Sequence, residues 1–222
     1  MGVPHDLGSR SRLTLRDAQR FGEGTLFDKI ARTVCAAECL PRKELYEAWE
    51  VARRVRRRFR GGRVLDLAAG HGLLAQLLLV LDDSSPEAIA IDPKTPSSAA
   101  TLGEAMERTW PRLQGRVLRR AERIDDVDVR AGDLLVSVHA CGALTDRVLA
   151  RAVAARARVV VLPCCHDDET CDRGALSGWI DGALAIDVVR AERLRAAGYA
   201  VHTELVPEAI TPKNRLLMGT PS

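Results

Sequence analysis

One stretch of the sequence constrains the fold more than any other: VLDLAAGHGLL at residues 64–74, which AIDP follows at residues 90–93. Its apolar start predicts a short buried strand, its glycines a tight turn, and its leucines a helix that leads to a second strand. Gly70 and Gly72 let the backbone turn tightly and approach a ligand closely. Asp92, at the end of the second strand, can accept hydrogen bonds from both ribose hydroxyls. The stretch therefore predicts a unit that binds a nucleoside cofactor.

The spacing of this unit differs from that of the dinucleotide-binding type. That type needs G-x-G-x-x-G to seat a pyrophosphate on the helix N-terminus, and here Ala75 stands at the third glycine position. Asp66, inside the first strand, would also repel phosphates, but it suits a positively charged amino-acid moiety. The unit therefore favours a nucleoside cofactor other than a dinucleotide.

Strands and helices alternate along the rest of the chain. Apolar runs predict strands at residues 63–68, 88–92, 116–120, 134–139, 159–162, 200–206 and 215–218. Helical segments separate most of them, at about residues 73–81, 99–110, 145–157 and 182–197. Continuous apolar runs in the first five strands predict an α/β fold with a mainly parallel sheet and helices on both faces. The last two strands lack a long helix between them, so we expect an antiparallel hairpin at one edge.

The chain before this alternation divides into two parts. Residues 1–24 are rich in Gly, Ser and Arg with little periodicity, and they predict a flexible N-terminal segment. Residues 25–60 have a helical pattern and lead into a domain at 61–222. Cys35 and Cys39 would lie one turn apart on one helix face, where packing is favoured over a metal site because no second pair follows at finger-like spacing.

An amphipathic helix is predicted at residues 43–59, and its polar face begins the densest basic cluster of the chain. The cluster comprises Arg53, Arg54, Arg56, Arg57, Arg58, Arg60 and Arg63. A solvated helix face is the simpler interpretation, and contact with an RNA backbone is the alternative. The formal charge of +3 is too small to indicate a nucleic-acid partner by itself.

Composition limits the class of protein. No apolar run approaches the roughly 18 to 20 residues that span a bilayer, and the N-terminus lacks the apolar segment of a signal peptide. Six cysteines in 222 residues are too few and too clustered for a secreted disulfide scaffold. We therefore expect a soluble, cytoplasmic protein with reduced thiols, no membrane partner and an oligomeric state that the sequence leaves open.

Sulfur and imidazole groups follow the fourth and fifth strands: His139 and Cys141 after the fourth, and Cys164, Cys165 and His166 after the fifth. Because ligands bind at the carboxyl ends of parallel strands, these groups are expected to share one mouth. The alternatives are a zinc site, a cysteine nucleophile that attacks a pyrimidine, simple packing, or a shaped pocket in which a histidine orients or deprotonates an acceptor. The pocket is favoured. No metal is predicted, because the adjacent cysteines should alternate in direction and a tetrahedral set would need Cys171 and an irregular loop.

The first unit resembles motif I of class I S-adenosylmethionine-dependent methyltransferases, whose Rossmann-like fold has a seven-stranded sheet that ends in an antiparallel hairpin. Four more stretches resemble the methyltransferase-domain family that includes eukaryotic tRNA 2′-O-ribose methyltransferases and glutathione S-transferase C-terminal-domain-containing proteins. They are HACGALTD (139–146), PCCHDDETC (163–171), AIDVVR with LRAAGY (185–199), and TPKNRLLMG (211–219). The resemblance covers most of the chain from about Lys43 and implies S-adenosylmethionine as the methyl donor.

The resemblance also implies roles for individual residues. Cofactor contacts are expected from Asp66, Ala68, Gly70, Gly72, Leu73, Asp92, Pro93, Ala121, Glu122 and His139. The catalytic mouth is expected to comprise His139, Cys141, Cys165 and His166. Lys43 and Glu47 resemble a family element that covers the cofactor, so the helices of residues 25–60 should cover that site. An Asp that often contacts adenine after the third strand is replaced here by Ala121 and Glu122, so the adenine contact should come from another group.

Two departures from the family bear on the acceptor. The tRNA enzymes resemble K-H-x-C-G after the fourth strand, where this chain has Val138 before His139, and they carry N-terminal zinc fingers that this sequence lacks. The sequence therefore predicts a methyltransferase with RNA, such as tRNA, as the first hypothesis for the acceptor and a small molecule as the second. A non-catalytic S-adenosylmethionine-binding partner subunit is the hypothesis of a different class.

Overall fold

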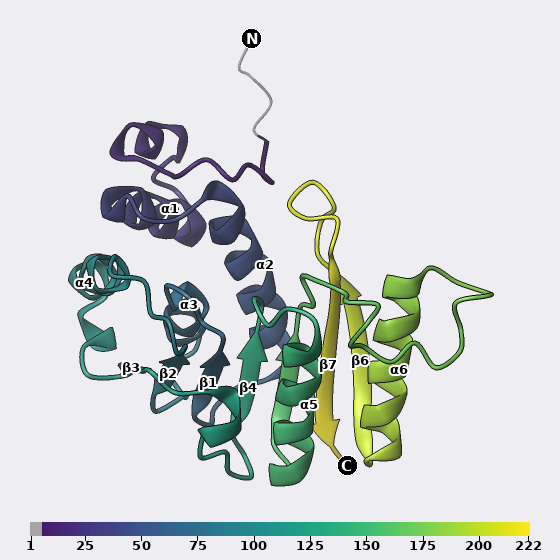
Figure 1. Cartoon of the computed structure of the whole chain (residues 1–222). Helices are drawn as coiled ribbons and strands as arrows, with labels where there is room; N and C mark the ends of the chain where they lie inside the picture. The colour runs from purple at the N-terminus through teal and green to yellow at the C-terminus, as the bar shows by residue number, and fades with distance from the viewer. Residues whose placement is uncertain (1–5) are drawn as a thin grey trace.

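The computed structural model of the protein describes residues 6–222, which form a seven-stranded sheet in the order β3-β2-β1-β4-β5-β7-β6 (Figure 1). The strands are β1 (Val64–Leu67), β2 (Ala88–Ile91), β3 (Val117–Arg120), β4 (Leu134–Ser137), β5 (Arg158–Val161), β6 (Tyr199–Leu205) and β7 (Arg215–Pro221). The first five strands pair in parallel, and β7 pairs antiparallel with both β5 and β6. The predicted parallel sheet with an antiparallel hairpin at one edge is confirmed.

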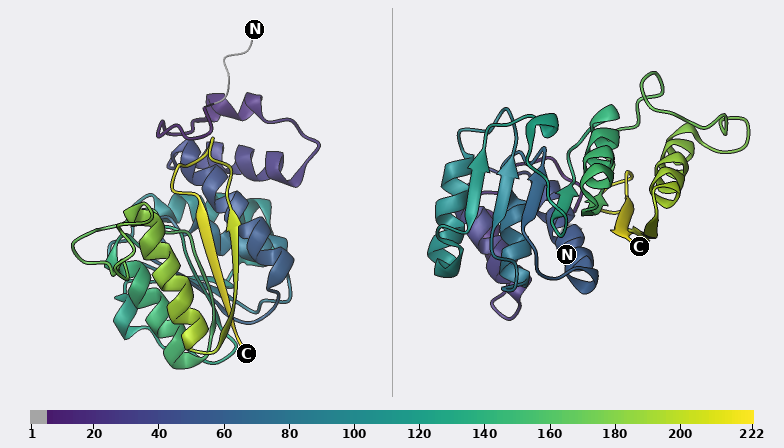
Figure 2. Two further views of the ribbon diagram at one scale, coloured as in Figure 1. Left: turned by 90° about the vertical axis from the view of Figure 1, so that its right-hand side faces the viewer. Right: turned by 90° about the horizontal axis from the view of Figure 1, so that it is seen from below.

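The helices lie on both faces of this sheet. They are α1 (Leu26–Ala37), α2 (Arg42–Arg58), α3 (Leu73–Leu81), α4 (Ala99–Thr109), α5 (Ala143–Ala155) and α6 (Gly182–Ala196), with short 3-10 helices η1 (Leu15–Arg20), η2 (Pro111–Leu113) and η3 (Ile124–Asp126). In the right-hand view of Figure 2, α5 and α6 lie on one side of the sheet and α2 and α3 on the other. Within residues 6–222, none of the helices has both the length and the apolar character needed to cross a membrane.

Alternation along the strands divides the core into two clusters. Leu65 and Leu67 of β1 pack in the cluster on the side of α5 and α6. Val64 packs in the other cluster, together with buried residues of α1, α2 and α3. Burial of both faces explains why the strands are continuous apolar runs. Asp66 follows the alternation of Val64 and therefore points toward α3.

The order of the strands reverses between β1 and β4. After β1 the chain adds β2 and β3 on one side, and it then returns to add β4 and β5 on the other. In open α/β sheets the connections diverge at such a switch point and leave a crevice at the carboxyl ends of the strands. This topology places the turn after β1 and the loop after β4 next to each other.

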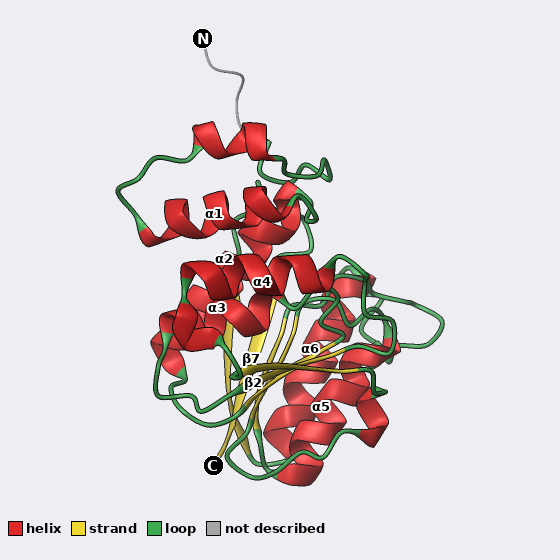
Figure 3. Cartoon of the chain, turned by 90° about the vertical axis from the view of Figure 1, so that its left-hand side faces the viewer, coloured by secondary structure: helices red, strands yellow, loops and turns green. Residues whose placement is uncertain are grey.

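The predicted flexible N-terminal segment falls partly on residues 1–5, which lie outside the described residues. In residues 6–24, Leu13 is 1% exposed, and its N–H donates to the carbonyl of Leu40 at 2.8 Å. Figure 3 shows this segment and its short helix η1 stacked on α1, above the sheet. This part of the segment packs on the fold, and its mobility stays a prediction.

The two N-terminal cysteines do not share a helix face, contrary to the prediction. α1 ends at Ala37, and Glu38 takes the left-handed conformation (φ 49) that terminates the helix before Cys39. Cys35 and Cys39 are both buried in the core. Burial raises the pKa of Cys35 to about 11, so this thiol behaves as a small packed apolar group.

Candidate functional site

Two aspartates hold the turn after β1. Asp66 Oδ2 accepts the N–H of Ala75, near the start of α3, at 3.1 Å. Asp92, just after β2, accepts the N–H of Gly70 on Oδ2 at 3.0 Å and the N–H of Lys94 on Oδ1 at 2.8 Å. These bonds fix the turn against both strands, so a ligand at this edge would meet a preorganised backbone.

Asp66 is a buried carboxyl with one oxygen left over. The residue is 1% exposed, and among the described residues nothing hydrogen-bonds its Oδ1. Burial raises the pKa of Asp66 to about 7, and the hydrogen bond from Ala75 only partly opposes this rise. A buried polar atom without a partner is costly. The group therefore fits a ligand that brings a cationic or N–H donor to this turn.

The two glycines of the turn are required for different physical reasons. Gly70 has φ +51, and a Cβ added to it would meet no atom within 4 Å, so its missing side chain leaves open space in front of the turn. Gly72 has φ +70, and a Cβ there would lie 2.9 Å from the Cβ of Ala90. Gly72 is thus required by packing against β2, whereas the prediction was that both glycines let the backbone approach a ligand. Ala68 also has positive φ (56), a strain of about 1 kcal/mol for a residue with a Cβ.

This difference predicts unequal effects of alanine at the two positions. Gly70→Ala is expected to destabilise the protein by about 1 kcal/mol, because only the left-handed backbone is disfavoured. Gly72→Ala adds a steric clash with β2, so we expect a loss of about 2 kcal/mol. Urea unfolding of both variants measures the difference, and equal midpoints would contradict the assignment.

A cavity of about 470 Å³ opens at the carboxyl ends of β1, β2 and β4. Its lining residues are Ala68, Asp92, Pro93, Lys94, Arg123, Ile124, His139, Leu144 and Arg147. A cavity of this size holds a ligand of nucleoside dimensions. We call this space the donor cavity. Four of the predicted cofactor contacts line it: Ala68, Asp92, Pro93 and His139.

The other predicted cofactor contacts lie behind or beside the donor cavity. Asp66, Leu73 and Gly72 are buried in the turn and the start of α3, and Gly70 is part of the same turn. Ala121 and Glu122 follow β3 as predicted, but the next two residues, Arg123 and Ile124, line the cavity in their place.

Arg123 and Ile124 were missed by the sequence reasoning, as were Lys94, Leu144 and Arg147. Because the usual Asp is missing after β3, the sequence left the adenine contact to another group. Ile124 is 7% exposed and belongs to η3, which carries it inward. An isolated apolar residue in the polar run AERIDD was the available signal. Ile124 thus gives the cavity an apolar wall where an acidic residue is usual.

A second cavity, of about 400 Å³, lies beside the first. It is lined by Cys141, Gly142, Ala143, Leu144, Arg147, Cys165, Asp167 and Thr170. We call this second space the acceptor cavity. Leu144 and Arg147, both in the first half of α5, line both cavities. The structure thus brings the predicted Cys141 and Cys165 together at a space that adjoins the donor cavity.

The two histidines predicted for the mouth lie apart. His139 lines the donor cavity and lies near Glu44 of α2. Burial raises the pKa of Glu44, and the nearby His139 opposes that rise. The side chain of His166 is 3% exposed, and its Nε2 lies 2.9 Å from both carboxylate oxygens of Asp187. Its Nδ1 has no partner within the described residues, and His166 lines neither the donor nor the acceptor cavity.

Arg190 of α6 anchors the loop after β4. Its side chain is 1% exposed, and Nη2 lies 2.9 Å from Asp146 Oδ2 and donates to the carbonyl of Gly142 at 3.0 Å. Nη1 lies 3.3 Å from Asp187 Oδ1. Burial disfavours the charge of Asp187, but hydrogen bonds from His166 and Arg215 outweigh it and lower the pKa of this carboxyl. A buried ionic network therefore supports the wall of the acceptor cavity.

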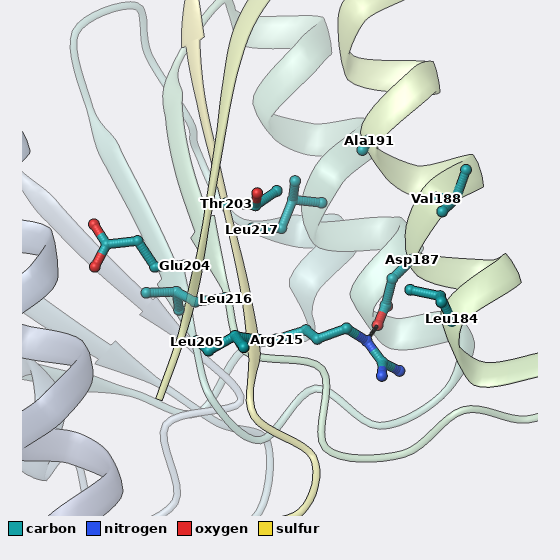
Figure 4. Close-up of a pocket in the computed structure, with 10 residues that line it drawn as sticks. All are labelled: Leu184, Asp187, Val188, Ala191, Thr203, Glu204, Leu205, Arg215, Leu216 and Leu217. Atoms are coloured by element: carbon teal, nitrogen blue, oxygen red, sulfur yellow. Dashed lines mark hydrogen bonds and ion pairs between the residues drawn. The ribbon is translucent and has the colours of Figure 1, made fainter. Parts of the chain in front are cut away.

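A third cavity, of about 400 Å³, lies between α6 and the β6–β7 hairpin (Figure 4). Its wall is mostly apolar, and Arg215 reaches across to Asp187, with Nε 2.7 Å from Oδ2. It shares no lining residue with the donor or acceptor cavity. This groove is therefore separate from the site at the carboxyl ends of the strands.

The arginine cluster, most of which lies on α2, lines neither the donor nor the acceptor cavity. α2 runs down the sheet in Figure 1 and ends shortly before β1 begins, so its last turns lie at the amino ends of the strands. Arg56 is 3% exposed and pairs with Asp82 at 3.1 Å, and Arg63 pairs with Asp133 at 2.7 Å. Arg57, although exposed, lies 2.8 Å from Glu204. Much of the cluster is thus neutralised within the chain.

Comparison with known proteins identifies the family. The family model described as "Methyltransferase domain" matches residues 43–170, more than half of the chain. No curated protein matches in sequence.

Similar solved structures include an O-methyltransferase family protein from Burkholderia thailandensis (19% identity, TM-score 0.54), covering 99% of this chain and 67% of that one. The tRNA methyltransferase TrmK of B. subtilis matches at 16% identity and TM-score 0.52, over 79% of this chain and 65% of that one. The S-adenosylmethionine-dependent methyltransferase SibL matches at 18% identity and TM-score 0.50, over 96% and 66%. The chain thus spans about two thirds of the length of these structures, and at such identities they share its fold. The chain belongs to the family described as "Methyltransferase domain" and has the class I methyltransferase fold.

Proposed function

We propose that the protein transfers the methyl group of S-adenosylmethionine, bound in the donor cavity, to an acceptor bound in the acceptor cavity. The observation that carries this proposal is that the two cavities adjoin at the carboxyl ends of the strands and share Leu144 and Arg147. The unpartnered Oδ1 of Asp66 and the open space at Gly70 suit a nucleoside cofactor with a cationic amino-acid part. When bound, this cofactor supplies the activated methyl group.

The residues of the donor cavity fit the parts of this cofactor. Each oxygen of Asp92 accepts one backbone N–H and retains acceptor capacity for a ribose hydroxyl. Asp66 is the acidic group available to the amino-acid part. Ile124 offers an apolar surface for the adenine ring, and the Asp expected after β3 is absent.

Catalysis is proposed to rest mainly on positioning, because the cofactor carries the reactive group. Cys141 and Cys165 would border the acceptor, and His139 would lie on the donor side. His166, held by Asp187, would act as a positioning residue for the loop after β5.

A small molecule is the acceptor that the geometry supports best. The RNA hypothesis depended on the arginines of residues 53–63, which are largely paired within the chain and line neither cavity. The acceptor cavity, at about 400 Å³, has the volume of a small-molecule site. This proposal does not require that the chain be related to the tRNA 2′-O-ribose methyltransferases.

Calorimetric titration with S-adenosylmethionine tests the donor site. Asp92→Ala is expected to weaken binding by about 100-fold, because charge-assisted hydrogen bonds to the ribose are lost. Asp128→Ala is the matched control: this aspartate is 60% exposed and lines neither cavity, so its affinity should equal that of the wild type. Failure of the wild-type protein to bind S-adenosylmethionine would overturn the proposed function.

Labelled S-adenosylmethionine incubated with fractionated cell extract tests the acceptor class. Label is expected in the small-molecule fraction. Label in RNA would overturn the proposed acceptor but not methyl transfer. Tight cofactor binding with no transfer to any fraction would instead favour a non-catalytic partner subunit.

A further inference from the structure

Three cysteine sulfurs meet at the wall of the acceptor cavity. The Sγ atoms of Cys141, Cys164 and Cys165 all lie within 4.8 Å of one another, and those of Cys141 and Cys164 are 3.0 Å apart. Cys141 and Cys165 are exposed and line the cavity, whereas Cys164 is half-buried. Three soft donor atoms therefore converge at one place that solvent and a ligand can reach.

The path of the backbone explains how two adjacent cysteines both approach Cys141. β5 ends at Val161, so Cys164 and Cys165 lie in irregular chain, where side chains need not alternate as they do in a strand. This removes the objection that the sequence raised against a metal site.

A single glycine brings the two loops together. Gly142 has φ 54 and ψ −129, a conformation that a side chain would disfavour, and its N–H donates to the carbonyl of Cys165 at 3.2 Å. Arg190 holds the carbonyl of the same glycine from the other side. The sulfurs are thus positioned by a backbone bond and a buried side chain, and not by chance proximity on a mobile surface.

Packing alone does not account for the cluster. Two of its three cysteines are exposed, whereas a cysteine that serves as a small packed apolar group is buried.

We propose that Cys141, Cys164 and Cys165 bind a zinc ion as thiolates and leave its fourth coordination position open to the acceptor cavity. Zinc prefers four ligands in tetrahedral geometry, with sulfur at about 2.3 Å, which sets the sulfurs about 3.8 Å apart. The separations here, 3.0 Å between Cys141 and Cys164 and no more than 4.8 Å for the other pairs, lie on either side of this value.

The composition of the cluster indicates the kind of zinc site. Within residues 6–222, no fourth His, Cys, Asp or Glu joins the three cysteines. Structural zinc sites are closed by four protein ligands, whereas sites that bind a further molecule have three and an open position. The role beside the acceptor rests on the proposed function, but the existence of the site does not.

Metal analysis of the full chain, expressed with added zinc, tests the site. We expect about one zinc per chain, and a tetrahedral thiolate spectrum when cobalt replaces zinc. Cys164→Ser and Cys165→Ser should each reduce zinc content to less than a tenth of that in the wild type. Cys171→Ser is the matched control, because this buried cysteine follows in the same loop but lies outside the cluster, so it should retain the metal.

Two results would overturn the inference. One is a zinc content below about half an equivalent together with no cobalt spectrum. The other is a disulfide between Cys141 and Cys164, detected as two missing free thiols in the denatured protein. Titration of the same samples with S-adenosylmethionine separates the proposals, because cofactor binding by a zinc-free protein would leave the proposed function standing and remove only this site. Circular dichroism of each variant is the check that it is folded.

Discussion

Asp66→Asn is expected to stabilise the ligand-free protein at pH 8 and to weaken its binding of S-adenosylmethionine. The charge of Asp66 is buried, with one oxygen unpartnered, so ionisation is unfavourable before the cofactor binds. The amide has the same size and can still accept the N–H of Ala75. It carries no charge for the cationic part of the cofactor, and we expect about a 30-fold loss of affinity, or about 2 kcal/mol.

The pH dependence of this effect has a definite sign. The pKa of Asp66 is about 7 in the folded protein and 3.8 in its unperturbed state, so between these values the folded chain holds a proton that the unfolded chain has lost. The stability contributed by this group is therefore complete below about pH 4 and is lost as the pH rises through about 7. The full shift corresponds to about 4 kcal/mol, an upper bound.

Urea unfolding of the wild type and Asp66→Asn at pH 5 and pH 8 measures this linkage. The advantage of the variant should grow from pH 5 to pH 8, because only the wild type loses stability as Asp66 ionises. Asp128→Asn, at an exposed carboxyl, should show no comparable change. A variant less stable than the wild type at pH 8, or one with unchanged cofactor affinity, would contradict the role given to Asp66.

Arg190→Ala is expected to destabilise the protein by about 3 kcal/mol or more. The change removes a buried charge that pairs with Asp146 and Asp187, and it leaves the carbonyl of Gly142 with the N–H of Thr145 as its remaining donor. Breaking a buried pair is costly because the remaining charges lose their compensation. Arg193→Ala is the control from the same helix, because Arg193 is 55% exposed and also contacts Asp146. This change should lower the free energy of unfolding by less than about 1 kcal/mol.

Thermal and urea unfolding measure both arginine variants. Because Arg190 supports the loop after β4 and not the turn after β1, the folded fraction of Arg190→Ala should still bind S-adenosylmethionine. Equal stability of the two arginine variants would show that the buried network does not hold the acceptor loop.

The strands and helices were largely predictable because both faces of the sheet are buried. The apolar runs of β1, β2, β4 and β5 marked those strands to within two residues at either end, and the spacing around Gly70 located the donor cavity. β3 was also predicted, although it lies at the sheet edge and is only partly buried. Local pattern sufficed where burial is uniform along an element.

The parts that escaped prediction depend on contacts distant in the sequence. His166 turns away from the mouth because Asp187, on α6, binds its imidazole. Arg56, counted in the basic cluster, is buried and forms an ion pair with Asp82. Cys164 and Cys165 both approach Cys141 because they lie in irregular chain after β5, and Gly142 binds this chain at the carbonyl of Cys165. Periodicity in a single segment carries no information on these partners.

The wall formed by Leu144 and Arg147 limits how this protein can change its substrate. A substitution there that reshapes the acceptor cavity also reshapes the donor cavity, so selection or engineering for a new acceptor would also alter the proposed binding site of the methyl donor. Thr170 and Asp167 line the acceptor cavity but not the donor cavity. Diversification of acceptor specificity within this fold is therefore expected to begin in the loop that follows β5.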